Sequence, residues 1–507
     1  MTDRTETQSD VVAFLRDPAS HAGAEEVEVI ATHASMIFLA GNRAFKLKKA
    51  VTYSFLDYGT VGLREAACRA ELALNRRTAP QLYLGIRAIR CRADGRLGWD
   101  GAGETLDWVV EMVRFPQEAL FSHLVEQGGL TPQIMRATAD AIAAFHRSAE
   151  VTPGFGGAEG IAAVLRINAE NMRECLPPAV ASEDVGRLIA ATRSAFDRHQ
   201  SLLEARRQAG KVRRCHGDLH LGNICLLDGQ PTLFDGIEFS DMIANTDMLY
   251  DLAFLLMDLL HRGHADFASI VFNRYLDRSD EADGLALLPL FLSLRAAVRA
   301  HVTARAALPQ PSPSAAAYFA RAEDLLRPVA PRLIAIGGLS GTGKSTLAAA
   351  LAPLIGQAPG ARWLRSDVLR KRHFGLAPEE KLPPAAYTRE INDLIYGQLM
   401  AATRAALASG YSVILDAVAA KPDERAAFAA LAKEAKVPFT GLWLEADPAI
   451  LTARLEARRN DASDADAAVL RQQLAYNLGP MDWQRVDAGG DFAATLSAAR
   501  QVLELPL

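Results

Sequence analysis

The chain has 507 residues, half of them hydrophobic, and its 55 Lys and Arg residues against 60 Asp and Glu residues give a net charge of −5. The length predicts two or three domains with sizeable cores, and the mild acidity argues against a dedicated nucleic-acid binder. Five scattered cysteines without C-x-x-C spacing argue against a cysteine metal motif and a disulfide framework, and they favour a reducing cytoplasm.

The N-terminal segment is polar and acidic, and it lacks the apolar core of a signal peptide. Nowhere do about 18 uncharged apolar residues follow one another, so we expect no membrane span.

Two strands are predicted within residues 36–51, joined by a Gly-Asn turn. Because side chains alternate along a strand, Lys46 and Lys48 share one face of the second strand. A helix is predicted over residues 63–77, and it contains Glu71.

Residues 215–241 read CHGDLHLGNICLLDGQPTLFDGIEFSD, which predicts two short strands joined by an Asp-Gly turn. Asp218 and Asn223 lie on the loop before these strands, and Asp235 ends the second strand. The arrangement brings two carboxylates and an amide to one edge, which suits phosphoryl transfer. The Asp-x-x-x-x-Asn spacing matches a kinase catalytic loop, with Asp235 in the metal-binding position that follows.

Through HGDLHLGN and FDGIEF, at residues 216–223 and 234–239, the chain resembles the aminoglycoside phosphotransferase and choline kinase group, relatives of protein kinases. The resemblance covers most of residues 30–305 and implies an ATP-dependent kinase with a bilobal protein-kinase-like fold. It also implies that Asp218 is the catalytic base and that Asn223 and Asp235 are Mg²⁺ ligands. It further implies that His216 orients the catalytic loop and that Asp251 supports this loop without taking part in the chemistry.

The same resemblance implies an upstream lobe in which one lysine pairs the α- and β-phosphates of ATP and Glu71 is the partner of that lysine. We place Lys46 ahead of Lys48 in this role. The alternative is that both lysines belong to a solvated strand face. No glycine-rich loop of the G-x-G-x-x-G type precedes them, which is a departure from protein kinases. Residues 111–114 follow an apolar run and are a candidate hinge for adenine.

Three prolines within residues 308–314 predict an extended connector, followed by a short helix. The expected organisation is a kinase-like domain over residues 1–308, a Pro-rich linker with a short helix over 309–330, and a second domain over 331–507.

The second domain opens with GLSGTGKS at residues 338–345, between a predicted strand and a predicted helix. Such a phosphate-binding loop turns backbone N–H groups toward one anion, and its lysine and serine contact the terminal phosphates and Mg²⁺. The nucleotide-binding residues predicted here are Gly338, Ser340, Gly341, Thr342, Gly343, Lys344, Ser345 and Thr346.

Further strands are predicted at residues 363–365 and 411–418. Asp367 follows the first at the strand end where ligands bind in open parallel sheets, and Arg370 lies one helical turn on. We expect Asp367 to activate, and Arg370 to steer, an acceptor hydroxyl. Alternatively, Asp367 is an ordinary helix N-cap. Asp416 ends the second strand and is predicted to join the Mg²⁺ shell through water.

Arg454 and Arg458 lie four residues apart on a predicted helix that leads into a polar loop, as in the lid of small P-loop kinases. A solvated basic helix face is the alternative. Together with the phosphate-binding loop, these segments resemble the gluconate kinase, polynucleotide kinase and zeta toxin branch of P-loop kinases over residues 332–505. The resemblance implies a three-layer α/β/α P-loop NTPase fold with a parallel sheet.

The sequence therefore predicts a bifunctional cytoplasmic phosphotransferase, both of whose modules use ATP and Mg²⁺ to phosphorylate an alcohol on a small molecule such as a sugar. Three alternatives stay open. The chain could be an aminoglycoside-resistance kinase, its C-terminal module could act on nucleic-acid ends, or one module could be a nucleotide-sensing regulator. The acceptors and the oligomeric state are not specified by any motif.

Overall fold

The computed structural model describes residues 8–32, 34–53, 56–457 and 463–506. By its internal contacts the chain divides into two compact units, Met1–Val164 with Gln200–Leu255 and Leu165–His199 with Leu256–Leu507. Each unit contains one candidate site.

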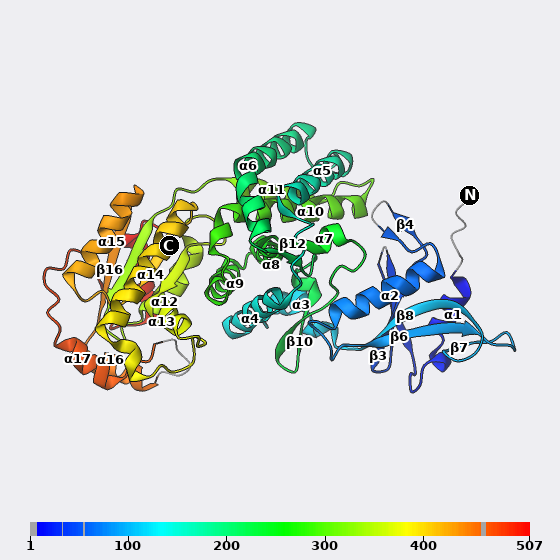
Figure 1. Cartoon of the computed structure of the whole chain (residues 1–507), viewed down its shortest axis with the longest axis horizontal. Coiled ribbons are helices and arrows are strands. Elements are labelled where there is room, and N and C mark those ends of the chain that lie inside the picture. The colour runs from blue at the N-terminus through cyan, green and yellow to red at the C-terminus, as the bar shows by residue number, and fades with distance from the viewer. Residues whose placement is uncertain (1–7, 33, 54–55, 458–462, 507) are drawn as a thin grey trace. The chain divides into compact units, whose positions relative to one another are not determined.

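A six-stranded antiparallel sheet opens the first unit (Figure 1). In spatial order its strands are β1 (Val27–Ala31), β2 (Ser35–Ala40), β3 (Arg43–Lys48), β8 (Glu104–Val113), β6 (Tyr83–Cys91) and β7 (Leu97–Trp99). Strands β2 and β3 confirm the two strands predicted around the Gly-Asn turn. Phe45 and Leu47 pack toward α1 (Ser9–Arg16), so Lys46 and Lys48 face α2 (Val61–Asn75) on the other side.

The rest of the described part of the first unit combines helices with three short antiparallel pairs of strands. Strands β10 (Ile224–Leu227) and β11 (Gln230–Leu233) confirm the predicted pair, and Asp228 and Gly229 form the turn with positive φ angles of 49° and 73°. The other elements that position the site are α3 (Phe121–Glu126), α4 (Pro132–Ser148), β9 (Val212–Arg214), α7 (Asp241–Ala244), β12 (Asn245–Asp247) and the start of α8 (Met248–His261).

The helices α9 (Ala265–Arg278), α10 (Leu288–Ala307) and α11 (Pro313–Leu326) lie wholly in the second unit, whereas α5 (Gly157–Cys175) and α6 (Ser182–Gln208) are divided between the two units. Helix α11 is the short helix expected after the prolines, and it packs on α10, where Ser293 donates to the carbonyl of Ala322 at 2.8 Å. The predicted boundary at residues 309–330 stays a prediction.

Residues Ala282–Ala307 are long and apolar enough to span a membrane by length and composition alone. However, 72% of the most apolar window is buried inside the protein, as in an ordinary core helix. The expected absence of a membrane span and the cytoplasmic location stay predictions.

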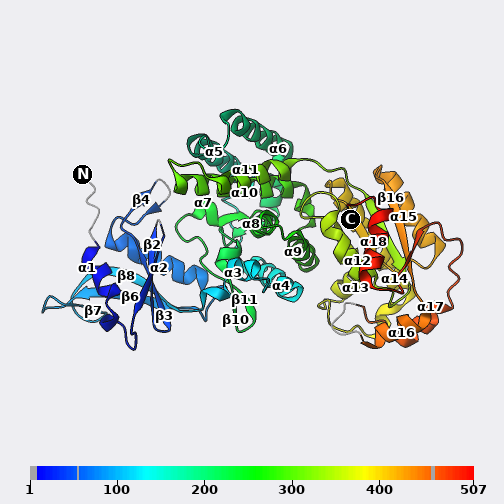
Figure 2. The same cartoon turned by 180° about the vertical axis from the view of Figure 1, so that it is seen from behind.

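A five-stranded parallel sheet forms the rest of the second unit. Its spatial order is β14 (Arg362–Arg365), β15 (Val413–Asp416), β13 (Leu333–Gly338), β16 (Phe439–Glu445) and β17 (Gln484–Asp487). Leu442 and Leu444 pack with α12 (Lys344–Leu351) and α18 (Phe492–Val502), which lie side by side (Figure 2). Trp443 faces the opposite side, where Arg425 of α15 (Pro422–Ala435) lies 5.9 Å from its ring. The predicted three-layer architecture is confirmed.

Gly441 of β16 lies at a tightly packed point of the sheet. A Cβ atom there would lie 2.3 Å from Cγ of Trp483, whose side chain is buried. We expect Gly441→Ala to lower the free energy of unfolding of the second unit by about 1–3 kcal/mol, measured as a lower melting temperature in calorimetry of the full chain.

Gly397, on the exposed side of α14 (Arg389–Ala408), is the matched control, because a Cβ atom there meets nothing within 4 Å. Gly397→Ala should stabilise the unit by about 0.5–1 kcal/mol. An unchanged melting temperature for Gly441→Ala would contradict the packing described for Trp483.

Candidate active sites

Lys46 is the centre of the first site. Its Nζ lies 2.9 Å from Oε1 of Glu71 on α2 and 2.5 Å from Oδ1 of Asp235, which follows β11. Burial alone would lower the pKa of Lys46, but the carboxylates of Asp235 and Glu71 outweigh it and raise the pKa well above its ordinary value. Three segments far apart in the sequence therefore meet at one permanently charged ammonium group.

Lys48 belongs to the same face but has different partners. Its Nζ contacts Glu71 and lies 2.5 Å from Oε1 of Glu238, which also accepts a hydrogen bond from the Tyr58 hydroxyl at 2.7 Å. The Lys48 side chain is 2% exposed, whereas that of Asp235 beside Lys46 is 40% exposed. Glu238 was missed by the sequence analysis, since its only signal was its place in FDGIEF.

The catalytic-loop residues are held close together. Nδ2 of Asn223 donates to Oδ2 and to the backbone carbonyl of Asp218, both at 2.9 Å. This leaves Oδ1 of Asn223 as the atom of the amide that can bind a cation. His220, which the sequence analysis did not single out, lies 3.4 Å from Oδ2 of Asp218 through Nε2.

Asp235 occupies an unusual backbone conformation, with a φ angle of 60°. A non-glycine residue in this region is held by its surroundings, and here the Asp235 N–H donates to the Tyr83 hydroxyl at 3.1 Å. The carboxylate of Asp235 and the Oδ1 atom of Asn223 are hard oxygen donors of the kind that Mg²⁺ prefers. The donor set fits the predicted metal role of both residues.

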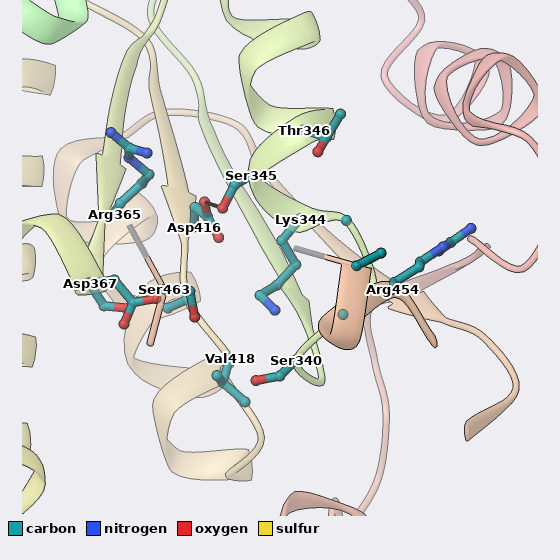
Figure 3. A pocket seen from close by; sticks show the side chains of 15 residues that line it. Ser340, Lys344, Ser345, Thr346, Arg365, Asp367, Asp416, Val418, Arg454 and Ser463 are labelled. Atoms are coloured by element: carbon teal, nitrogen blue, oxygen red, sulfur yellow. Dashed lines mark hydrogen bonds between the residues drawn. The ribbon is translucent and has the colours of Figure 1, made fainter. Parts of the chain in front are cut away.

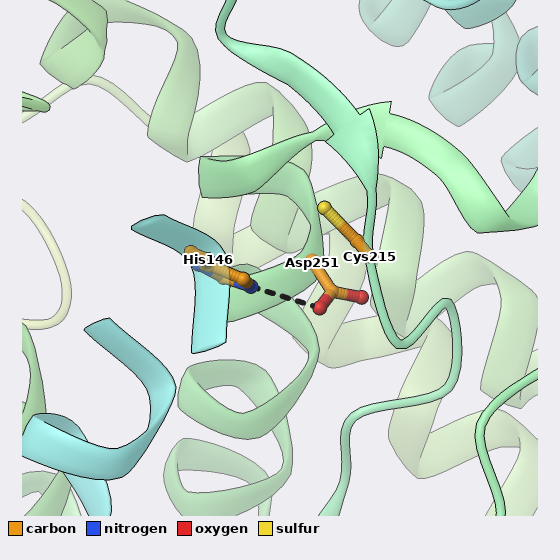
Figure 4. A group of neighbouring side chains, drawn as sticks. All are labelled: His146, Cys215 and Asp251. Carbon is orange, nitrogen blue, oxygen red and sulfur yellow. Dashed lines mark hydrogen bonds and ion pairs between the residues drawn. The ribbon is translucent and has the colours of Figure 1, made fainter. Parts of the chain in front are cut away.

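Asp251 holds the backbone of the catalytic loop through hydrogen bonds. Its carboxylate accepts the backbone N–H groups of His216 at 3.2 Å and Gly217 at 2.8 Å, and His146 lies 3.0 Å away through Nε2. Figure 4 shows His146 directed at Asp251, with Cys215 on the other side of the carboxylate. All three side chains are buried, as expected for a structural cluster.

His216 is also buried, and its Nε2 lies 2.9 Å from the carbonyl of Phe234, the residue before Asp235. Burial lowers the pKa of His216. The neutral ring therefore donates to Phe234 and joins the catalytic loop to the segment that contains Asp235.

The phosphate-binding loop forms the floor of the second site. Gly338, Gly341 and Gly343 have φ angles of 141°, 88° and 85°, which favour glycine. A Cβ atom on Gly338 would also lie 2.6 Å from the carbonyl of Leu444. Helix α12 begins at Lys344, so its N-terminus faces the loop.

Ser345 and Asp416 meet at the carboxyl edge of the sheet. The Ser345 hydroxyl donates to Oδ2 of Asp416 at 2.6 Å, and the indole N–H of Trp363 lies 3.3 Å from the same oxygen. Burial raises the pKa of Asp416, while Lys344 and the Ser345 hydrogen bond partly offset this. The hydroxyl and carboxylate oxygens fit a Mg²⁺ shell.

A cavity of about 380 Å³ opens above the loop (Figure 3). Of the predicted residues, it is lined by Ser340, Gly341, Gly343, Lys344, Ser345, Thr346, Asp367, Asp416 and Arg454. Asp367 is the second residue of α13 (Ser366–His373), whose N-cap Arg365 makes no side-chain cap. Burial, and then the charge of Asp416, raise the pKa of Asp367.

Three predicted residues do not line this cavity. Thr342 turns its hydroxyl to the carbonyl of Leu339 at 2.8 Å, and Gly338 lies beneath the loop. Arg370 donates to the carbonyl of Ala386 at 2.8 Å and to Oδ1 of Asn392 at 2.7 Å.

The predicted lid is described only in part. Arg454, on α16 (Pro448–Ala457), donates to the carbonyls of Ala488 at 2.7 Å and Gly490 at 3.2 Å. Figure 3 shows its side chain directed away from Lys344. Arg458 lies outside the described residues. The role of both arginines as a lid stays a prediction.

Gln473 and Arg365 are among the residues of the second site that the sequence analysis missed. Gln473 of α17 (Ala467–Leu474) accepts the N–H of Ser340 at 2.8 Å, so a side chain distant in sequence contacts the phosphate-binding loop. Arg365 lines the cavity from the end of β14. The only available signal was its position one residue before Ser366-Asp367.

Comparison with known proteins matches two separate parts of the chain to two different family models. Residues 61–288 match the model of the phosphotransferase enzyme family, and residues 333–478 match an AAA domain model. Uncharacterised proteins from Mycobacterium tuberculosis and Mycobacterium bovis are 33% identical to the chain over 478 residues, which cover 92% of this chain and 93% of each relative.

Solved structures match parts of the chain. A gluconokinase from Sinorhizobium meliloti is 22% identical and covers 34% of this chain and 92% of its own length, with a TM-score of 0.25. A choline/ethanolamine kinase family protein from Mesorhizobium loti is 14% identical and covers 63% of this chain and 95% of its own length, with a TM-score of 0.39.

The two lysines of the first site should have separable effects. In a Lys344→Ala background, Lys46→Met is expected to weaken ATP binding at the first site at least tenfold. The reason is that Lys46 is the cation paired with the partly exposed carboxylate of Asp235. Lys48→Met leaves Glu238 without its cation and should instead lower the free energy of unfolding by about 3–5 kcal/mol. Calorimetric titration and thermal melting measure the two effects.

Glu238→Gln is the control, because it also breaks the Lys48 pair without touching Lys46. It should lower the melting temperature and leave ATP affinity within about twofold. Loss of ATP binding in Lys48→Met with an unchanged melting temperature would reverse the assignment of the two lysines.

The Asp367 carboxylate should lower the stability of the folded protein at neutral pH. Its pKa is raised in the folded protein, so folding favours the protonated form and the carboxylate destabilises the fold above that pKa. Asp367→Asn is therefore expected to raise the melting temperature at neutral pH in EDTA. The gain should shrink as the pH falls toward the ordinary carboxyl pKa, and a gain independent of pH would contradict this account.

Proposed function

The chain belongs to the family of its mycobacterial relatives, and from that premise we propose that it is a bifunctional enzyme, each of whose two sites transfers the γ-phosphoryl group of ATP to an alcohol. The matched phosphotransferase and P-loop domains make it an ATP-dependent kinase. The proposal adds that both sites are active, that both use Mg²⁺, and that both acceptors are small molecules.

One observation carries the proposal: each unit brings together a lysine, a carboxylate and one further hard oxygen donor. The first unit brings Lys46 to Asp235, and the N–H of Phe234, the residue before Asp235, donates to the backbone carbonyl of Asn223. The second places Lys344 at the start of α12 and joins the Ser345 hydroxyl to Asp416. A cation beside two hard oxygen donors suits a magnesium-bound polyphosphate in each case.

In the first site, the carboxylate of Asp218 accepts the proton of the acceptor hydroxyl, and the amide N–H of Asn223 holds that carboxylate in place. Asn223 and Asp235 would hold Mg²⁺, which would neutralise charge on the phosphates. Lys46, fixed by Glu71, contacts the phosphates. Asp251 and His216 fix the loop geometry, since positioning and electrostatics provide most of the rate in such reactions.

In the second site, the loop N–H groups and Lys344 would hold the β- and γ-phosphates, while Ser345 and Asp416 would hold the metal. Asp367 accepts the proton of the acceptor hydroxyl, and its raised pKa makes it a stronger base than an exposed aspartate. The cavity of about 380 Å³ is on the scale of a small-molecule site. A sugar or sugar-like metabolite is the acceptor class that we propose for both modules.

The test is a screen of acceptor-dependent ATP consumption against sugars, sugar acids, amino alcohols, aminoglycosides, nucleosides and RNA ends. It compares the full chain with Asp218→Asn and Lys344→Ala. Each active acceptor should lose its signal, by at least about 100-fold, in one variant and keep it in the other, because each variant removes a group that acts in one site only.

Loss of every signal in both single variants would contradict two independent centres. Activity confined to aminoglycosides or to RNA ends would replace the proposed acceptor class with one of these. The double variant, which should consume no ATP with any acceptor, is the background control.

A further inference from the structure

The edge of the parallel sheet is covered by a helix that precedes the P-loop domain in sequence. Asn273 of α9 donates to the carbonyl of Ala361 at 3.2 Å and accepts the N–H of Trp363 at 2.8 Å. The side-chain amide thus pairs with β14 as a neighbouring strand would, and it satisfies backbone groups that an edge strand leaves open. Both partners lie within the second compact unit.

Charged groups extend this contact by one helical turn. Asp277 of α9 lies 2.6 Å from a guanidinium nitrogen of Arg362 and 3.5 Å from one of Arg365, and the side chains of Asp277 and Arg362 are each 7% exposed. Arg274 pairs with both carboxylate oxygens of Glu379 at 2.9 and 3.2 Å. Breaking a buried ion pair leaves an uncompensated charge at high cost, so α9 and β14 form a fixed contact.

Strand β14 leads from this contact directly into the second site. The guanidinium of Arg365 lies 4.2 Å from the ring centroid of Trp363, and the indole N–H of Trp363 lies 3.3 Å from the Asp416 oxygen that accepts the Ser345 hydroxyl. Figure 3 shows Arg365 beside Asp416 and directed away from Lys344.

We propose that Asp277 is a positioning residue of the second site. By holding Arg362 and Arg365 it fixes β14, and through Trp363 it fixes Asp416. This inference rests on the metal-binding role proposed above for Asp416. Helix α9 lies within residues 61–288 of the phosphotransferase match and outside residues 333–478 of the AAA match. The first module therefore supplies a supporting residue to the catalytic centre of the second.

The experiment compares Asp277→Asn with Asp280→Asn in the full chain. Asp280 also pairs with an arginine, Arg372, but its side chain is 92% exposed, so its loss should have little effect. ADP binding is titrated in an Asp235→Asn background. Binding at the second site is defined as the part of the ADP binding that Lys344→Ala abolishes.

Asp277→Asn should raise the Mg²⁺ concentration at half-maximal ADP binding by about tenfold, as is usual when an outer-shell partner of a metal site is removed. ADP affinity in EDTA should be unchanged, which separates positioning from a general loss of structure. Asp280→Asn should leave both quantities unchanged. Trp363→Phe should reproduce the Mg²⁺ shift, and the double variant should shift no further than either single variant, because both act on one chain of contacts.

A lower melting temperature for Asp277→Asn with an unchanged Mg²⁺ midpoint would overturn the inference, because Asp277 would then be purely structural. Asn273→Ala loosens the same strand without leaving a charge, and it should shift the midpoint in the same direction even if Asp277→Asn does not fold. A shift in Trp363→Phe alone would also overturn the role of α9. Absence of any Lys344-dependent ADP binding in the parent would overturn the proposed function, and this inference with it.

Discussion

Buried charge that must be neutralised organises the first site. Lys46 and Lys48 project from one strand into a space largely closed to water, where an unpaired ammonium group would be far too costly. Glu71 serves both lysines, and each lysine has a second carboxylate, Asp235 or Glu238, from the segment after β11. The sheet, the helix α2 and the metal-binding segment are thereby fixed to one another, and the catalytic loop is fixed to that segment through His216.

The same constraint acts in the second unit at the contact between α9 and β14. Asp277 neutralises Arg362 and Arg365, and it can do so only if the helix lies against the sheet edge. A helix that follows the first catalytic loop in sequence thereby belongs physically to the P-loop sheet. The division into compact units shows the same association, because residues 256–507 group together. Sequence motifs and compact units therefore divide this chain at different places.

Local patterns predicted much of this molecule because they depend on neighbouring residues. Glycine spacing and flanking apolar runs were sufficient for the loop at residues 338–345 and for β13, and alternation placed Lys46 and Lys48 on one face. Contacts between distant segments could not be predicted in this way. Arg370 looked suitable because it follows Asp367 by one turn, yet its guanidinium is held by Ala386 and Asn392, while Arg365 lines the cavity. Gln473 carried no signal and Glu238 only its place in FDGIEF, since their roles arise only when remote segments meet.

The contact between Gln473 and Ser340 has a consequence for how the phosphate-binding loop is filled. One backbone N–H cannot donate fully to a glutamine oxygen and to a phosphate oxygen at once, so an arriving anion must compete with Gln473 for it. The glutamine oxygen accepts this N–H as a phosphate oxygen would. Displacement of Gln473 would remove one contact that holds α17. Binding of an anion in the loop would therefore loosen that helix.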